Sequence, residues 1–298
     1  MPADSVTALD DQPTVLSLSD VHGYRDRFES ALLTLADHPA FDPVVERAGD
    51  ADGAEEQGAE SLRWVGGDEY VLVVNGDLVD RGPDSQGCLE LLDRLRREAP
   101  DGHVRYLVGN HELYLPYPSP PEWDRWYSAR VDDECRRRFW TRVAAGDVTA
   151  AFEGYEHTYV HAGSPDGVDP AALNDGFRAV AADLRERVGH DDRESFERVF
   201  GEQCPALFSF GGEAGPVRED PDAGVVWLDF SHLPADAPPQ IVGHTPHEAV
   251  TRTGTVVCQD VIVSNASSPG GESLLVETPD DLRALVRQPD GDVSVRTA

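Results

Sequence analysis

A three-part unit occurs three times in the first part of the chain and constrains the fold more than any other feature. Each copy combines a short apolar strand, a polar turn that contains glycine, and a segment that favours a helix. The predicted strands are residues 14–19, 71–74 and 104–108. Strands that alternate with helices favour an α/β fold, and open α/β sheets keep their ligand crevices beyond the carboxyl ends of the strands. The polar turns are therefore where a functional site is expected.

The second unit carries the densest group of ionisable residues. The run 71–74 is short, rich in β-branched residues and stopped by Asn75-Gly76, which is typical of a buried strand. Asp77, Asp80 and Arg81 follow directly. A rigid strand that ends at this point would place the carboxylate of Asp77 in the crevice, where it could bridge metal ions.

Composition indicates the conditions in which the protein works. The chain has 298 residues, 40% of them hydrophobic, which is enough for one large domain with insertions. Aspartate and glutamate number 56 against 25 basic residues, all of them arginine, and the formal net charge is -31. The scattered carboxylates favour adaptation to concentrated salt, where charges are screened within about 3 Å at 1 M, over an acidic tail for basic partners.

The same charge argues against nucleic acid and anionic membranes as partners, because both need a basic surface. No apolar run is long enough to span a bilayer, and residues 1–13 are too polar and acidic for a signal peptide. The cysteines lie far apart without CxxC spacing, which predicts reduced thiols: Cys88, Cys135, Cys204 and Cys258. We therefore expect a cytoplasmic protein, and the sequence gives no indication of its oligomeric state.

Four segments interrupt a single predicted domain over residues 1–298. Residues 1–12 are predicted to be a loose leader, and residues 42–69, rich in glycine and acid, a solvated loop insertion. Residues 113–156 and 164–224 are predicted to be cap-like or peripheral insertions. In the first of these, apolar residues recur every four positions and favour a helix packed on the core, with a lid over the crevice as the alternative: Trp123, Tyr127, Val131, Cys135 and Phe139. In the tail we expect short strands at 255–257, 261–263 and 274–277.

Two later turns add histidine after short apolar strands, at His161-Ala-Gly163 and at Gly243-His244-Thr245. The five strand ends then supply two carboxylates, three imidazoles and one amide oxygen: Asp20, His22, Asp77, Asn110, His161 and His244. This set suits manganese, iron or zinc in fivefold or sixfold coordination, and it does not suit a structural thiolate zinc site. Since six ligands exceed what one ion takes while keeping water, we predict two ions that share Asp77, about 3.5–4 Å apart.

Two ions at this spacing favour hydrolysis. They lower the pKa of a bridging water from about 15.7 towards neutrality, and that water can attack phosphorus in line. A single aspartate at a strand end is more often a turn former or helix cap, so the prediction rests on the joint placement of all the turns.

Taken together and in order, the turns resemble the calcineurin-like metallophosphoesterase superfamily. The Gly76-Asp-Leu-Val-Asp-Arg-Gly82 block is similar to the phosphoprotein phosphatase branch and its bacterial-type relatives, which include diadenosine tetraphosphate hydrolases. The other blocks are Asp20-Val-His-Gly23, Gly109-Asn-His-Glu112, His161-Ala-Gly163 and Gly243-His-Thr245. The resemblance implies a four-layer α/β/β/α sandwich with a dinuclear metal site at the carboxyl ends of the strands.

The resemblance also implies a role for each ligand. The first ion would be held by Asp20, His22 and Asp77, and the second by Asp77, Asn110, His161 and His244. Manganese is the expected metal, with iron and zinc as alternatives. His247 follows three residues after His244, where many diesterases of the superfamily space the two histidines by two, so it is the weaker candidate ligand.

Catalytic roles follow from the same resemblance. His111 would be the general acid that protonates the leaving oxygen, and Asp80 would orient its imidazole and favour the charged form. The planar guanidinium of Arg81 would bind the phosphoryl group through paired hydrogen bonds, and Asn110 and His111 would also contact the phosphate. Glu112 is predicted to be a structural carboxylate bonded to nearby backbone.

The implied reaction is hydrolysis of phosphate monoesters, most closely like that of serine/threonine phosphoprotein phosphatases. A dinucleoside polyphosphate or nucleotide hydrolase is the alternative, and a non-catalytic binding module is a third hypothesis. The chain departs from the eukaryotic enzymes at Ser19, Val108 and Ala162, where they carry glycine, arginine and glycine. These differences leave the predicted metal ligands intact and bear on the class of substrate.

Overall fold

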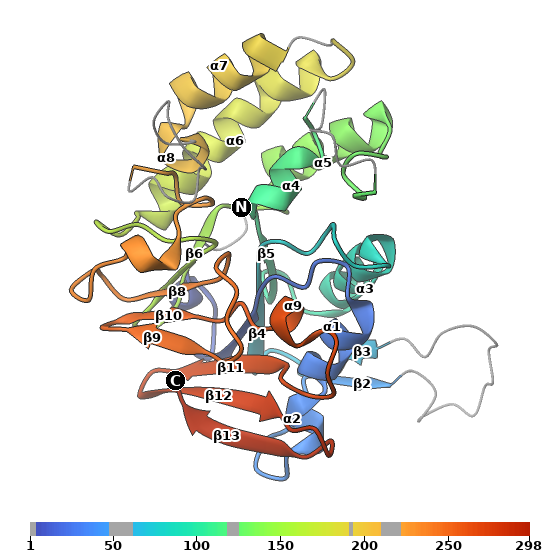
Figure 1. The fold of residues 1–298 in the computed structure, drawn as a ribbon, viewed down its shortest axis with the longest axis vertical. Helices are drawn as coiled ribbons and strands as arrows, with labels where there is room; N and C mark the ends of the chain where they lie inside the picture. Colours follow the sequence, from blue (N-terminus) through green and yellow to red (C-terminus); the bar gives the residue numbers. More distant parts are fainter. Residues whose placement is uncertain (1–3, 48–61, 118–124, 191–192, 210–221) are drawn as a thin grey trace, which may run out of the picture.

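The structure is a computed structural model that describes residues 4–47, 62–117, 125–190, 193–209 and 222–298. Within these residues, two β-sheets share a buried apolar cluster and helices lie outside them (Figure 1). The predicted α/β/β/α sandwich is confirmed.

The first sheet contains the three strands of the repeated units that the sequence predicts. Strands β1, β4 and β5 run parallel, and β11 to β13 continue the sheet in antiparallel pairs. Its order is β13 (Val293–Thr297), β12 (Asp281–Arg287), β11 (Ser273–Thr278), β1 (Thr14–Leu18), β4 (Tyr70–Asn75) and β5 (Val104–Leu107).

The second sheet has a parallel centre, formed by β7, β8 and β10, between antiparallel edge strands. Its order is β6 (Ala151–Glu153), β7 (Thr158–Val160), β8 (Gln240–Val242), β10 (Val256–Cys258) and β9 (Thr251–Thr253). A separate pair joins β2 (Val45–Arg47) to β3 (Leu62–Trp64).

The helices divide between the two sheets. Helices α1 and α3 contribute to the apolar cluster on the outer face of the first sheet, and α6 packs on β6 and on α5. The described helices are α1 (Arg25–Leu32), α2 (Thr34–Asp37), α3 (Ser85–Glu98), α4 (Asn110–Tyr114), α5 (Asp133–Ala145), α6 (Pro170–Arg187), α7 (Arg193–Gln203), α8 (Pro205–Phe208) and α9 (Ile262–Asn265), with short 3-10 helices at Val6–Ala8 and Phe230–His232.

Strand β4 is apolar on both faces because both faces are covered. Side chains alternate along a strand, so Val71 and Val73 belong to the cluster between the sheets, together with Ile241 of β8. Leu72 and Val74 point the other way, into the cluster formed with the helices. This double burial explains the continuous apolar run in the sequence and makes β4 a rigid support for the turn that follows it.

Asn75, the last residue of β4, ties the two sheets together. Its side-chain amide is buried and donates to the carbonyl oxygens of Val160 at 3.2 Å and Ile241 at 3.0 Å, which lie on the second sheet. Its own carbonyl accepts from Nδ1 of His161 at 2.9 Å. One residue therefore fixes the ends of β4, β7 and β8 relative to one another.

A second polar bridge between the sheets is centred on Glu277 of β11. Its buried carboxylate accepts from Nδ1 of His157 at 2.8 Å, from the hydroxyl of Tyr159 at 2.9 Å, and from the backbone of the turn before β7. These hydrogen bonds satisfy the buried carboxylate and join the first sheet to the second.

The predicted loose leader and the predicted solvated insertion are both more ordered than expected. In the leader, residues 4–9 are not loose, because Val6 is buried and Ser5 bridges to Glu153 beside β6. In the 42–69 insertion, Val45, Leu62 and Trp64 are buried where β2 pairs with β3. A few apolar side chains in an acidic stretch were sufficient to dock both segments, and residues 1–3 and 48–61 of these predictions lie outside the described residues.

Helix and strand predictions also failed at two places. In the 113–156 segment the helix begins only at Asp133, capped by Asp132, so Tyr127 and Val131 lie in turns before α5 and Trp123 lies outside the described residues. Phe139 is buried, as expected for a helix that packs on the core. In the tail, the predicted strand 261–263 is wrong, because α9 begins at Ile262. None of the described helices is long and apolar enough to cross a membrane.

We expect Asn75→Ala to lower the free energy of unfolding by about 3 kcal/mol, because two buried carbonyl groups lose their donor. Denaturant unfolding at fixed salt measures this loss. Asn265→Ala is the matched control, since that amide also donates to two carbonyls but from a half-buried position that water can reach, and it should cost less than about 1 kcal/mol. Equal losses in the two variants would contradict the bridging role of Asn75.

Candidate metal centre

Five parallel strands from both sheets end at one place, and each delivers a polar side chain there. Asp20 and His22 follow β1, Asp77 follows β4, Asn110 begins α4 after β5, His161 follows β7 and His244 follows β8. All six side chains are buried, with 5% exposure or less. The structure thus brings together all six residues that the sequence predicts as ligands.

The contacts among these residues form a closed ring. Asp77 Oδ2 lies 3.5 Å from His22 Nε2 and 3.4 Å from His161 Nε2. Asn110 Oδ1 lies 3.3 Å from His161 Nε2 and 3.0 Å from His244 Nδ1. The ring closes at Asp20, whose carboxylate accepts the backbone N–H of His244 and lies 3.9 Å from His22 Nε2.

The backbone at the strand ends is unusual. Six residues with side chains adopt positive φ, which costs of order 1–3 kcal/mol each: Asp20 (53°), His22 (48°), Asp77 (53°), Asp80 (71°), Arg81 (60°) and His244 (67°). Such strain persists only where the surroundings enforce it, and it concentrates here on the turns that carry the ligands.

Glu112 is one of the groups that enforce the turn after β4. Its carboxylate accepts the backbone N–H groups of Asp77 at 2.7 Å, Leu78 at 2.8 Å and Gly109 at 2.8 Å, and the hydroxyl of Tyr106 at 2.8 Å. These contacts agree with the structural role predicted for Glu112. A side chain at Gly109 would collide with the carboxylate and backbone of Asp77, so only glycine fits there.

Backbone carbonyls orient two of the imidazoles. Nδ1 of His22 lies 3.0 Å from the carbonyl of Val79, and Nδ1 of His161 lies 2.9 Å from the carbonyl of Asn75. Each ring therefore directs Nε2 into the centre, which is how proteins usually present histidine to a metal. Among the described residues, Nε2 of His22 has no hydrogen-bond partner although it is buried.

The electrostatics of the centre favour a bound cation. Burial raises the pKa of Asp77, but His161 and His111 outweigh it and hold this pKa well below its usual range. Burial lowers the pKa of His161, yet Asp77 and Asp20 outweigh it and raise the pKa to about 10. Burial lowers the pKa of His22 well below normal, so that its ring is neutral and can act as a ligand. A metal ion that bound the His161 imidazole would therefore have to displace a proton from that ring.

The donor set fits divalent metal ions. Two groups of side chains could each hold a metal ion, because within each group the possible ligand atoms lie within 4.8 Å of one another. One group is His22, Asp77 and His111, and the other is Asp77, His161 and His244. Asp77 belongs to both groups, as expected of a bridging carboxylate. The first group contains His111 in place of Asp20, whose carboxylate is engaged by the backbone of His244 in this structure.

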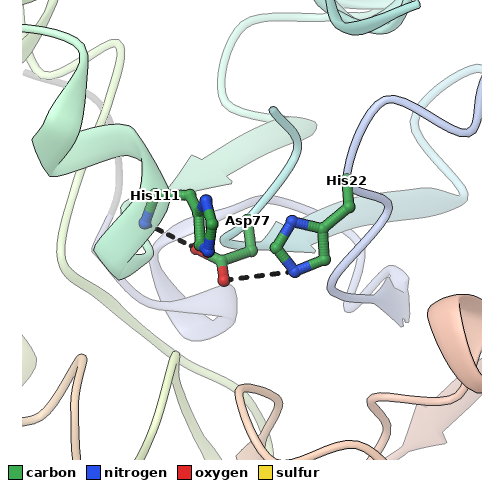
Figure 2. A group of neighbouring side chains, drawn as sticks. All are labelled: His22, Asp77 and His111. Carbon is green, nitrogen blue, oxygen red and sulfur yellow. Dashed lines mark hydrogen bonds and ion pairs between the residues drawn. The ribbon is translucent and has the colours of Figure 1, made fainter. Parts of the chain in front are cut away.

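The predicted catalytic residues lie beside this ring (Figure 2 shows His111 and His22 on either side of Asp77). The backbone N–H of His111 donates to Asp77 Oδ1 at 2.9 Å, and its ring Nδ1 donates to Asp80 Oδ2 at 2.9 Å. Arg81 is exposed, and its Nη2 lies 3.3 Å from Nε2 of His111.

Two residues of the centre were missed by the sequence interpretation. Ser128 is buried and donates to both oxygens of Asp80, from its backbone N–H at 2.9 Å and from Oγ at 2.8 Å. Asp260 is buried after β10, and burial followed by the charges of Asp20 and Asp77 raises its pKa well above normal. The strand 256–258 before Asp260 was the available signal, since it is another apolar run that ends in a carboxylate.

His247 is not a member of either group of candidate ligands. Its ring lies 5.5 Å from that of Phe230, and its backbone N–H donates to the carbonyl of Asp260.

Fold and site together define a metallohydrolase of the phosphoesterase class. The model of the calcineurin-like phosphoesterase family matches residues 13–211, about two thirds of the chain, and the chain therefore belongs to this family. The match ends before His244, which nevertheless contacts Asn110 in the ring of candidate ligands. A search of curated proteins found no matching sequence.

Two solved structures with TM-scores above 0.5 show the same fold at low identity. A cold-active protein-tyrosine phosphatase of a psychrophilic Shewanella is 18% identical with a TM-score of 0.59, and a point mutant of a cold-active protein tyrosine phosphatase is 20% identical with a TM-score of 0.56; each match covers 99% of this chain and 82% of the other. A serine/threonine phosphatase from Saccharomyces cerevisiae is 16% identical with a TM-score of 0.44, covering 100% and 84%.

We expect Asp77→Asn to lose both ions, because a neutral amide lacks the negative charge with which a carboxylate bridges two cations. Elemental analysis after manganese loading and desalting should give about two ions per chain for the unaltered protein and well below one for the variant. Asp93→Asn, a surface aspartate paired with Arg142, is the control and should keep both. Retention of two ions by Asp77→Asn would contradict the shared position.

Proposed function

We propose that this chain hydrolyses phosphate monoesters on proteins, using two divalent ions held by the ring of strand-end ligands, with manganese as the working metal. The observation that carries the proposal is the contact of His111 with Asp80, directly beside Asp77 and within reach of Arg81. A carboxylate, an imidazole and a guanidinium in this arrangement provide a proton donor and a phosphoryl-binding group next to the ligands.

When bound, the ions would supply an acidified water as the nucleophile and would offset the charge of the phosphoryl group. The protein residues supply the rest. Asp80 fixes the ring of His111 through Nδ1, so that Nε2 faces the crevice and can protonate the leaving oxygen. Because that donation occurs as the ester bond breaks, it favours loss of poor leaving groups most.

The guanidinium of Arg81 has two alternative partners, His111 and the phosphoryl group of the substrate. In the structure its Nη2 lies 3.3 Å from Nε2 of His111. A phosphoryl group binds a guanidinium more strongly than an imidazole does, so a bound substrate would draw Arg81 away from His111. Nε2 of His111 would then be free to face the leaving oxygen, which couples the binding of phosphate to the acid role of His111.

The substrates we propose first are phosphoserine and phosphothreonine in proteins, as the Gly-Asp-x-Val-Asp-Arg-Gly block implies. We further propose that the protein works in the cytoplasm at high salt concentration, which the net charge of -31 and the absence of lysine support. The free cysteines agree with a reducing compartment, since burial raises the pKa of the Cys88 thiol to about 12 and keeps it unreactive.

A direct assay tests the function. The purified protein, loaded with manganese in concentrated salt, should release inorganic phosphate from phosphoserine and phosphothreonine peptides, and chelation should abolish the release. Diadenosine tetraphosphate is assayed beside them. Faster cleavage of the dinucleotide than of every peptide would favour the nucleotide hydrolase instead, and no turnover of any substrate would contradict an enzymatic role.

We expect His111→Asn to separate substrates by leaving group. Turnover of a phosphoserine peptide should fall by about 100-fold or more, because its alkoxide must be protonated, whereas p-nitrophenyl phosphate should lose about tenfold or less. Initial rates at saturating substrate measure this, and elemental analysis checks that the variant keeps its metal. Equal losses on both substrates would rule out the acid role of His111.

A further inference from the structure

Three aromatic side chains form a wall along one side of the metal centre: Tyr114, Trp126 and Trp227. The ring of Trp126 lies 4.5 Å from that of His111, tilted by 46°, and Tyr114 lies 5.7 Å from His111. Tyr114 is 5.9 Å from each of the two indole rings, and Trp227 is 6.4 Å from His244. The aromatic wall therefore runs from the proposed acid to a ligand of the second group.

Trp126 is fixed over His111 by its neighbours in the chain. Ser128, two residues on, holds the carboxylate of Asp80 through two hydrogen bonds. The hydroxyl of Tyr127 donates to Gln86 Oε1 of α3 at 2.9 Å. The segment that carries the indole is thus anchored on the same carboxylate that orients His111, so the two rings keep their relative position.

The wall begins in the apolar core, to which Trp227 belongs and against which Tyr114 packs, and it extends from there to His111. Trp126 and Tyr114 are only half-buried, whereas a core residue such as Trp140 is fully buried. Both half-buried rings pack on His111, a polar group that the proposed reaction requires. Aromatic surface that remains partly open beside a reacting group is suited to contact the substrate.

We propose that the aromatic wall binds the ring of an aryl leaving group, so that the site cleaves phosphotyrosine in addition to phosphoserine and phosphothreonine. The inference rests on the proposed function, because it takes His111 as the donor to the leaving oxygen. In the step, the oxygen of water bonds to phosphorus, the bond from phosphorus to the phenolic oxygen breaks, and that oxygen takes a proton. The products are inorganic phosphate and tyrosine.

The distance from His111 decides between a phenol and a nucleobase. In phosphotyrosine the ring is bonded directly to the leaving oxygen, so a ring that meets Trp126 must lie next to the group protonated by His111. In a nucleotide the base is separated from that oxygen by a ribose. A contact ring 4.5 Å from the acid therefore fits the phenyl group and lies too close for the base.

The test compares two peptides of identical sequence, one with phosphotyrosine and one with phosphoserine. We expect the unaltered protein to show a kcat/KM for phosphotyrosine at least equal to that for phosphoserine. Trp126→Leu should lower the phosphotyrosine value about tenfold, mainly through KM, and the phosphoserine value by less, so that the ratio falls at least fivefold. Trp126→Phe, which keeps an aromatic face, should restore most of the ratio.

Controls separate a binding contact from a structural one. Phe41→Leu changes a half-buried aromatic residue that packs beside His38, away from the ligands, and should leave the ratio unchanged. Tyr114→Leu provides a second variant of the wall, and thermal unfolding and metal content check that each variant is folded and loaded.

Equal losses on both peptides would overturn the inference, because Trp126 would then act only by positioning His111. A larger loss on diadenosine tetraphosphate than on phosphotyrosine would overturn it in favour of a nucleobase contact. Turnover of phosphoserine without any turnover of phosphotyrosine would refute the inference and leave the proposed function standing. No turnover of either peptide would refute the proposed function itself.

Discussion

The carboxylate of Asp77 is buried between imidazoles that come from both sheets, and the arrangement of the site depends on it. His22 approaches from β1 of the first sheet and His161 from β7 of the second, each within 3.5 Å of the same oxygen. A buried charge costs several kcal/mol unless it is paired and hydrogen-bonded. Here the pairing comes from imidazoles, from the backbone of His111 and, in our account, from metal ions.

Further carboxylates surround Asp77 and increase the demand for positive charge. Asp20, Glu112 and Asp260 are all buried nearby, and burial raises the pKa of each of them. The strained backbone of the ligand turns adds to the cost of this arrangement. Metal ions that bind only the folded chain would offset both costs, so that metal binding and stability are coupled.

Much of this centre could be predicted from the sequence, because apolar runs that end in polar turns define strand ends without any knowledge of packing. That reasoning found Asp77 after β4 and His244 after β8, which come from different sheets. It missed Ser128, because its role depends on a fold that returns residues 125–131 to Asp80 and no local pattern records this. It missed Asp260 because the following Val261-Ile-Val263 suggested a strand, whereas α9 begins there.

The segment before α5 also changes how the insertions are understood. It was predicted as part of a helix packed on the core, with a lid as the alternative, and the structure shows turns that carry Ser128 onto Asp80 and Trp126 onto His111. A region expected to be peripheral thereby contacts the groups that carry out the proposed chemistry. Sequence periodicity could not reveal this, because these contacts depend on turns and not on a helix face.

The central claim is that two metal ions share the carboxylate of Asp77. A crystal structure of the manganese-loaded protein, with data collected at wavelengths on either side of the manganese absorption edge, tests it most directly. Our account predicts two anomalous peaks about 3.5–4 Å apart with the Asp77 carboxylate between them. A single peak, or two peaks of which only one is bound by Asp77, would contradict it.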